Sequence, residues 1–404
     1  MSQLESGLQH VCPAALYDPL AGLAVALLAA VWACGVARRL PAGLVRFAAV
    51  LPCVVAFTLV TGCMNHRPAI VVMSAGFLWL WLANFKVLAL ALDRGPLAIR
   101  SLTFLQFVFS TVLPVHPLML KRAKVSSHEG PVSLLWILIS ITTKLPALWA
   151  FVHMLQFYDL PWLAQDVLWA LCLYLFLGPL LDIPGSVALG LLNLECESHM
   201  KNPFRTTSFT NYWQRWNLVA GSSLRHLIYD PLVEGRLVRH RPPEIGVRNS
   251  AGLAAHLHAR GASGEVRRAA GMVAAFLASA GIHELIIWLG TRSFSYQYRW
   301  FWFFAIQGPI VIAERCVASL WARAGLKPLP EAVMAPAALT ALFLVGSALF
   351  IEPCVKMGIA QGVLNETHRL LLPAERLLEP YLGGPVRALS GPLLSRLPRG
   401  GHHF

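Results

Sequence analysis

The chain has 404 residues, of which 56% are hydrophobic and only 13% are charged. Soluble proteins carry roughly 25% charged residues, so a soluble protein is excluded, as are a disordered chain, a coiled coil and a disulfide-stapled scaffold. The balance is basic, with 33 Lys and Arg against 20 Asp and Glu. This suits loops that lie against anionic lipid headgroups or attract an anionic substrate, whereas no compact basic domain suggests a nucleic-acid partner.

Long apolar runs predict an all-α integral membrane protein, a multi-span bundle of about eight or nine transmembrane helices. Runs of roughly 20 apolar residues are long enough to cross the hydrocarbon core. The expected spans are 19–37, 47–66, 68–92, 101–120, 131–155, 163–181, 269–290, 299–322 and 332–353. Segment 101–120 is the doubtful one, because Pro114, His116 and Pro117 interrupt it and a basic cluster ends it.

Basic residues in the short loops predict the orientation in the membrane. Lys and Arg gather in loops 38–46, 93–100 and 121–130, whereas 156–162 has neither. If 101–120 is re-entrant or interfacial rather than spanning, these basic loops all face the cytosol and the N-terminus is luminal. The C-terminal tail carries several Arg residues and fits this scheme less well, so its side stays open.

We expect a single domain over 1–404, divided into N-terminal spans (1–181), a polar and amphipathic cytosol-facing region (182–268), spans that carry the candidate site (269–353) and a tail (354–404). From Phe209 onward, apolar residues recur at helical spacing and give an aromatic-rich face, typical of a helix at the membrane surface. The 8 cysteines form no C-x-x-C pair and mostly lie in apolar runs. Neither a zinc site nor a disulfide framework is therefore expected.

The first candidate site is His283-Glu284, an imidazole and a carboxylate inside an apolar span. Ionisable groups within spans are costly and usually functional. The simpler alternative is a hydrogen bond between helices. The pair also begins like the zinc-protease motif H-E-x-x-H, but Ile287 stands where the second His would be needed. A metal site is therefore not expected here.

The second candidate is Asn217, which shares one face of the amphipathic helix with Trp213 and Ala220. A carboxamide on that face needs partners, and a hydrogen bond to a neighbouring helix end is the simpler explanation from the residues alone. Nearby, His226 and Asp230 match the H-x-x-x-D pattern of soluble acyltransferases. Because this chain is expected to be a membrane protein with a different fold from the soluble acyltransferases, we interpret the match as chance.

Taken together, these segments resemble the plant-type wax synthases, which are long-chain-alcohol O-fatty-acyltransferases of the membrane-bound O-acyltransferase (MBOAT) superfamily. The similar stretches occur in the expected order over roughly residues 75 to 320. They are Trp81–Lys86 with Asp93–Leu97, Tyr212–Asn217, Phe276–Ile286, Phe303–Gly308 and Val311–Glu314. Two departures stand out: Tyr212 occupies a position where the family usually has Phe, and one Arg of an Arg-Arg pair is absent.

The resemblance implies a buried reaction chamber in the endoplasmic reticulum membrane, where an acyl group passes from acyl-CoA to a long-chain alcohol and forms a wax ester. His283 would be the general base, and the resemblance places Asn217 in the active site as an oxyanion donor. Acyl-CoA is then a co-substrate, with no bound cofactor and no metal expected. The candidate substrate-binding residues are Trp213, Arg215, Trp216, Arg225 and Glu284, with Arg215 and Arg225 suited to the phosphates of CoA.

Two alternatives remain open, and the oligomeric state is not predicted. The same chemistry could act on a sterol, diacylglycerol or terpenoid hydroxyl. A protein of another class, a secondary transporter or channel, could use Lys86, Lys144 and Asp182 as an ion path. Against that, the two halves show no matching pair of broken spans, and Lys86 and Asp182 lie near span ends, where their side chains can reach the headgroups.

Overall fold

The computed structural model describes residues 18–64, 68–117, 134–196, 198–239, 262–367 and 369. Over these residues the chain is helical, and the only β-type pairing is an isolated bridge between Pro117 and Cys196. The predicted all-α membrane fold is confirmed.

Seven helices in the described residues are long and apolar enough to cross a membrane, against eight or nine expected. They are Pro19–Arg39, Leu44–Cys63, Ala69–Ala91, Trp162–Leu192, Ser263–Thr291, Tyr296–Arg323 and Glu331–Lys356. Expected span 101–120 is described as far as Pro117. In that part the α-helix is α6 (Phe104–Val112), whose nine residues rise about 14 Å, too little to span. Expected span 131–155 corresponds to α7 (Leu134–Phe157), a 24-residue helix that is not one of the seven; its first residues, 131–133, lie outside the described part.

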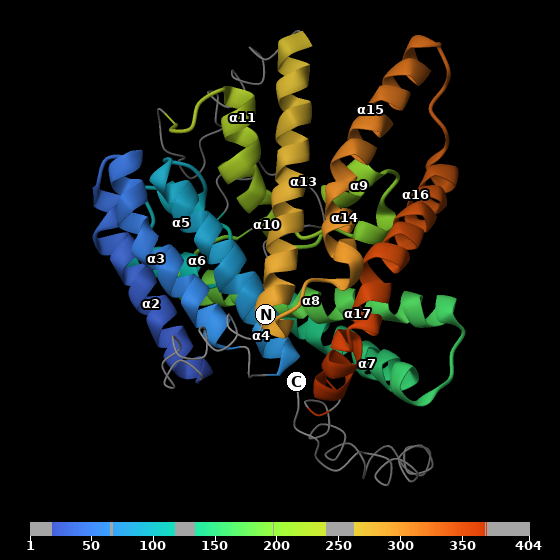
Figure 1. Cartoon of the computed structure of the whole chain (residues 1–404), viewed down its shortest axis with the longest axis horizontal. Helices are drawn as coiled ribbons and strands as arrows, with labels where there is room; N and C mark the ends of the chain where they lie inside the picture. The colour runs from blue at the N-terminus through green and yellow to red at the C-terminus, as the bar shows by residue number, and fades with distance from the viewer. Residues whose placement is uncertain are drawn as a thin grey trace.

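The spans are arranged in two groups on either side of a central helix, α13 (Figure 1). The helices α2, α3, α5 and α6 gather on one side, and α14, α15 and α16 on the other, while α7 and α8 run across the direction of α13. The remaining bounds are α2 (Pro19–Gly35), η2 (Ala37–Arg39), α3 (Leu44–Cys63), α4 (Ala69–Ala75), η3 (Gly76–Ala83), α5 (Asn84–Ala91), η4 (Pro96–Ala98), α8 (Trp162–Leu192), η5 (Pro203–Arg205), α9 (Phe209–Trp213), α10 (Leu218–Leu224), η6 (Arg225–Tyr229), α11 (Asp230–Glu234), α13 (Ala262–Thr291), η7 (Tyr296–Tyr298), α14 (Arg299–Ala305), α15 (Gln307–Arg323), α16 (Glu331–Gly346), η8 (Ser347–Ile351) and α17 (Glu352–Lys356).

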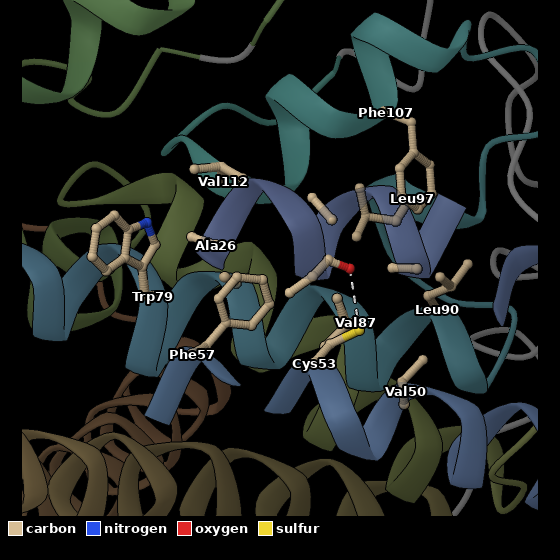
Figure 2. Packing of buried hydrophobic residues seen from close by; sticks show 14 of the residues in the cluster. Ala26, Val50, Cys53, Phe57, Trp79, Val87, Leu90, Leu97, Phe107 and Val112 are labelled. Carbon is tan, nitrogen blue, oxygen red and sulfur yellow. Dashed lines mark hydrogen bonds between the residues drawn. The ribbon is translucent and has the colours of Figure 1, made fainter. Parts of the chain in front are cut away.

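The N-terminal spans pack tightly because α2 presents a row of small side chains to its neighbours. Ala26, Ala30 and Ala33 are fully buried, and the larger side chains of α3, α5 and α6 fill the space against them (Figure 2). The thiol of Cys53 donates to the Ala29 carbonyl at 3.2 Å. This group forms a stable wall that supports one side of the central helix.

Two of the basic loops expected to face the cytosol, 38–46 and 93–100, meet each other and the polar region, whereas loop 121–130 lies outside the described residues. Arg46 forms a partly buried ion pair with Asp93, which joins loop 38–46 to loop 93–100. Arg94 pairs with Glu234 at 2.8 Å, which joins that loop to the polar region. These two ion pairs place the two loops at the same end of the bundle, and the side of the membrane that this end faces stays a prediction.

The cysteines differ from expectation at one position. Cys63, the last residue of α3, is disulfide-bonded, although the sequence predicts no disulfide framework. The other cysteines in the described part of the chain form no disulfide. Disulfides persist in oxidising compartments, and the basic loops predict that this end of α3 faces the non-cytosolic side.

Candidate active site

A cavity of about 780 Å³ lies between α13 and the helices around it. Residues from the third span to the C-terminal helices line it, and most of them are aromatic or aliphatic. His283 and Asn217, which are far apart in the sequence, both face this cavity. The structure therefore brings the two predicted catalytic residues to one chamber.

His283 is held in a defined state on α13. Its Nδ1 lies 2.7 Å from the Ser279 carbonyl oxygen, and because a carbonyl can only accept, Nδ1 carries the proton and Nε2 keeps its lone pair. The ring stacks on Phe304, with centroids 3.7 Å apart, and meets Trp81 edge-on at 4.9 Å. No described residue is bonded to Nε2, so this atom is free to accept a proton.

Trp81 reaches His283 because the third span approaches α13 closely. A Cβ on Gly76 would lie only 2.8 Å from the Ile286 side chain, so glycine is needed where the two helices touch. The π-helical segment η3 begins at this residue and carries the Trp81 ring to the imidazole. Trp81 enters the sequence resemblance but is not among the predicted site residues; its contact with His283 is a tertiary one.

Glu284 does not line the cavity, although it follows His283 directly. Its carboxylate accepts hydrogen bonds from the backbone N–H groups of Ser295 and Phe301, each at 2.9 Å, and from the Ser295 hydroxyl. Successive helical residues point about 100° apart, which explains why the two neighbours face different surroundings. Glu284 thus fastens the connection between α13 and α14, the helix that carries Phe304. Its position differs from the substrate contact that the sequence predicts.

Asn217 has an unusual backbone conformation, with φ 43° and ψ 61°, in the left-handed region that Asn tolerates better than most residues. Its side-chain oxygen accepts a hydrogen bond from the backbone N–H of Ala220 at 3.3 Å and caps the N-terminus of α10. The amide N–H₂ has no partner among the described residues. Because the oxygen is committed to the cap, the two N–H groups are left for a ligand in the cavity.

The predicted tryptophans line the same chamber and are fixed by neighbours. The indole N–H of Trp213 donates to the Gln307 side-chain oxygen at 3.1 Å, and the ring meets Phe276 edge-on at 5.5 Å. Trp216 stacks on Tyr212 at 5.7 Å. Gln307 is fully buried and is a site-supporting residue that the sequence does not single out, although it lies in one of the resembling stretches.

The arginines are distributed differently from expectation. Arg215 does not line the cavity; its guanidinium donates to the Asn211 side chain at 2.9 Å and to the Lys201 carbonyl at 3.1 Å. Arg225 does line it, with a side chain that is 58% exposed and pairs with Asp230. Arg315 on α15 also lines the cavity and is exposed. The cationic groups available at the chamber are thus Arg225 and Arg315.

Comparisons with known proteins give a consistent picture. No protein-family model matches the chain. It is similar to a probable long-chain-alcohol O-fatty-acyltransferase 3 of Arabidopsis thaliana, 25% identical over 71% of this chain and 75% of that protein. The long-chain-alcohol O-fatty-acyltransferase of Simmondsia chinensis is 26% identical over 75% of this chain and 80% of its own length. The acyl-CoA–sterol O-acyltransferase 1 of Arabidopsis thaliana is 26% identical over 82% and 88%.

The chain is a distant relative of the long-chain-alcohol O-fatty-acyltransferases. The predicted resemblance is confirmed, and the relatives cover most of the chain, including the segments that carry His283 and Asn217.

The H-x-x-x-D pair, His226 and Asp230, takes no part in the cavity. His226 does not line the chamber, and its Nδ1 lies 3.4 Å from an oxygen of Asp230. Burial alone would raise the pKa of the Asp230 carboxyl, but the hydrogen bond and charge of His226, together with Arg225, lower it to about 2. The pair is thus a structural contact beside η6, and no group of three or more His, Cys, Asp or Glu in the described ranges could hold a metal ion.

Two of the three ionisable residues proposed for an ion path, Lys86 and Asp182, are structurally engaged. Lys86 does not reach the headgroups as predicted: it is 1% exposed, and its ammonium donates to the carbonyls of Ser110 and Leu113, each at 2.7 Å. It closes the C-terminal end of α6, where backbone carbonyls lack helical partners. Asp182 lies beside His199. These contacts give both residues partners other than a transported ion.

Proposed function

We propose that the chain is a membrane-embedded acyl-CoA:alcohol O-acyltransferase that forms wax esters from long-chain fatty acyl-CoA and a long-chain fatty alcohol. One observation carries the proposal: a single apolar cavity is lined by an imidazole with a free Nε2 and by a carboxamide with free N–H groups. The named relatives act on long-chain alcohols or sterols, which supports the same class of reaction here.

The proposed mechanism uses the two groups in turn. Nε2 of His283 takes the proton of the alcohol as its oxygen attacks the thioester carbonyl. The oxyanion of the tetrahedral intermediate accepts a hydrogen bond from the Asn217 amide, a donor already in place before the charge develops. As the carbon–sulfur bond breaks, the CoA thiolate takes the proton from the imidazolium, and the ester is left in the chamber.

The residues that line the cavity suit two apolar chains, one of which carries the charged CoA group. Apolar side chains from several spans line most of the cavity, so an acyl chain and an alcohol chain both lose contact with water there, which is favourable. Arg225 and Arg315 at the exposed edge can receive the phosphates of CoA, because guanidinium groups bind phosphate oxygens in pairs. We place the enzyme in the endoplasmic reticulum as a multi-pass protein.

A sterol is the second candidate acceptor. The relative named acyl-CoA–sterol O-acyltransferase matches 82% of this chain, the same share as two probable long-chain-alcohol O-fatty-acyltransferases of Arabidopsis thaliana. The chemistry at His283 and Asn217 is the same for both acceptors, so only the product distinguishes them.

The deciding experiment uses membranes from a host that lacks neutral lipid synthesis. They receive labelled acyl-CoA with a panel of long-chain alcohols, sterols, diacylglycerols and terpenoid alcohols, and products are separated by thin-layer chromatography. We expect labelled wax ester with wild type and none with His283→Gln at equal protein level. Steryl ester without wax ester would overturn the acceptor, and the absence of any ester would overturn the acyltransferase.

A further inference from the structure

The loop that precedes η5 makes two contacts with the backbone at Asn217. The N–H of Leu218, the first residue of α10, donates to the His199 carbonyl at 2.9 Å. The N–H of Asn217 points to the sulfur of Met200 at 3.4 Å. Both N–H groups belong to a helix start, where donors have no intrahelical partner. The loop thereby holds the peptide N–H groups on both sides of the Asn217 Cα, and so supports the left-handed conformation of this residue.

Two further hydrogen bonds join the same loop to Arg215. Lys201 N donates to the Arg215 carbonyl at 2.8 Å, and the Arg215 guanidinium returns a hydrogen bond to the Lys201 carbonyl at 3.1 Å. Arg215 is one of the two arginines that the sequence suggests for the CoA phosphates. In the structure it connects the stretch Tyr212–Asn217 to the loop that precedes η5.

The imidazole of His199 anchors this loop inside the protein. It is 1% exposed. Its Nδ1 lies 3.3 Å from a carboxylate oxygen of Asp182 on α8, and its Nε2 lies 2.5 Å from the Pro114 carbonyl, just after α6. Each ring nitrogen thus lies beside an oxygen of a different element, which holds the ring between α8 and the end of α6. The backbone N–H of His199 also points to Asp182, at 3.4 Å.

We infer that His199 is a positioning residue for Asn217: its side chain is anchored between α8 and the end of α6, and its carbonyl holds the helix start that aims the Asn217 amide into the cavity. His199 itself does not line the cavity, so it acts through Asn217 rather than on a substrate. The inference rests on the proposed function for its catalytic meaning, but the positioning of the helix start can be measured without any activity.

The kinetic test is a double-mutant cycle with His199→Ala, Asn217→Ala and the pair together, assayed in the same membranes. If His199 acts by placing the Asn217 amide, His199→Ala lowers kcat by roughly tenfold to a hundredfold, a large part of the loss expected for an oxyanion donor, with KM changed little. The double variant should then be no slower than Asn217→Ala alone, because one donor is lost only once. Multiplied losses in the double variant would overturn the inference.

The matched control is His226→Ala, which removes another largely buried imidazole that is paired with a carboxylate and absent from the cavity lining. It should leave kcat within about twofold. A second variant, Asp182→Asn, serves if His199→Ala accumulates poorly. It keeps an oxygen acceptor for His199 and removes the charge, so it should lower kcat less than His199→Ala does, and again add no loss to Asn217→Ala.

Hydrogen–deuterium exchange in detergent gives the activity-independent measurement. Peptides that cover 217–221 should exchange faster in His199→Ala than in wild type, and remain unchanged in His226→Ala. Unchanged exchange in His199→Ala would overturn the positioning role whatever the enzyme assay shows. If wild type forms no ester while exchange behaves as expected, the proposed function fails and the positioning of the helix start stands.

Discussion

The two candidate catalytic groups, the His283 imidazole and the Asn217 amide, are positioned by different kinds of contact. His283 is part of a 30-residue helix, and its Nδ1 is bonded to a carbonyl one turn back on the same helix. Asn217 is a left-handed residue between helices of five and seven residues, and its backbone depends on a loop elsewhere in the chain. The state of the base is therefore mostly a local property of one helix, whereas the aim of the amide is a property of the tertiary structure.

The largest expected effect comes from the base. His283→Gln keeps a similar volume and a hydrogen-bonding side chain but has no basic nitrogen, so we expect ester formation to fall by roughly 10²–10⁴-fold, the scale of general-base catalysis. The rate is measured in membranes at matched protein level. Because α13 forms without the imidazole, the variant should accumulate normally. An active His283→Gln enzyme would show that the base lies elsewhere.

The next effect separates the amide's two functions. Asn217→Asp retains an oxygen that can cap α10 but normally lacks the N–H donor, so turnover should fall by roughly 10²–10³-fold with near-normal thermal stability in detergent. Asn217→Gly suits the left-handed backbone yet also lacks the donor, and it should be comparably slow. High activity in the glycine variant would mean that only the backbone conformation matters at this position.

Glu284→Gln tests the indirect support of the base. A Gln side chain has one accepting oxygen where the carboxylate has two, so one of the donors at Ser295 or Phe301 loses its partner. A buried unsatisfied donor lowers stability by roughly 1–3 kcal/mol, which a thermal unfolding scan in detergent would register. We expect a several-fold loss of kcat, because Phe304 is less firmly placed. Loss as severe as in His283→Gln, with normal stability, would instead indicate direct contact with a reactant.

The smallest expected effect concerns the space beside the amide. Gly221 lines the cavity one helical turn after Asn217, and a Cβ there would meet nothing within 4 Å. Gly221→Leu should therefore occupy part of the chamber and reduce use of the longest substrates several-fold more than that of short ones. The comparison is kcat/KM across a chain-length series. Gly281→Leu is the matched control, because Gly281 also has open space but does not line the cavity; equal effects in both would exclude a steric role in the chamber.

The parts of the molecule that follow from local sequence could be predicted, and those that depend on distant contacts could not. Apolar runs identify the seven spans because chain length and hydropathy decide them, and the His-Glu pair is visible within one of these runs. The role of His199 is hidden because its acceptor at Pro114 lies 85 residues away. The sequence feature that points to this contact is Asp182, because a carboxylate among apolar residues needs a partner. The sequence does not identify that partner.

The buried ammonium of Lys86 has a consequence for how the protein enters the membrane. Its carbonyl partners lie 24 to 29 residues later in the chain, so Lys86 emerges from the ribosome ahead of them. A lone ammonium in hydrocarbon is unfavourable. The third span and α6 should therefore be released into the lipid together, as a helical hairpin, and truncation of the nascent chain before residue 110 should leave the third span inefficiently integrated.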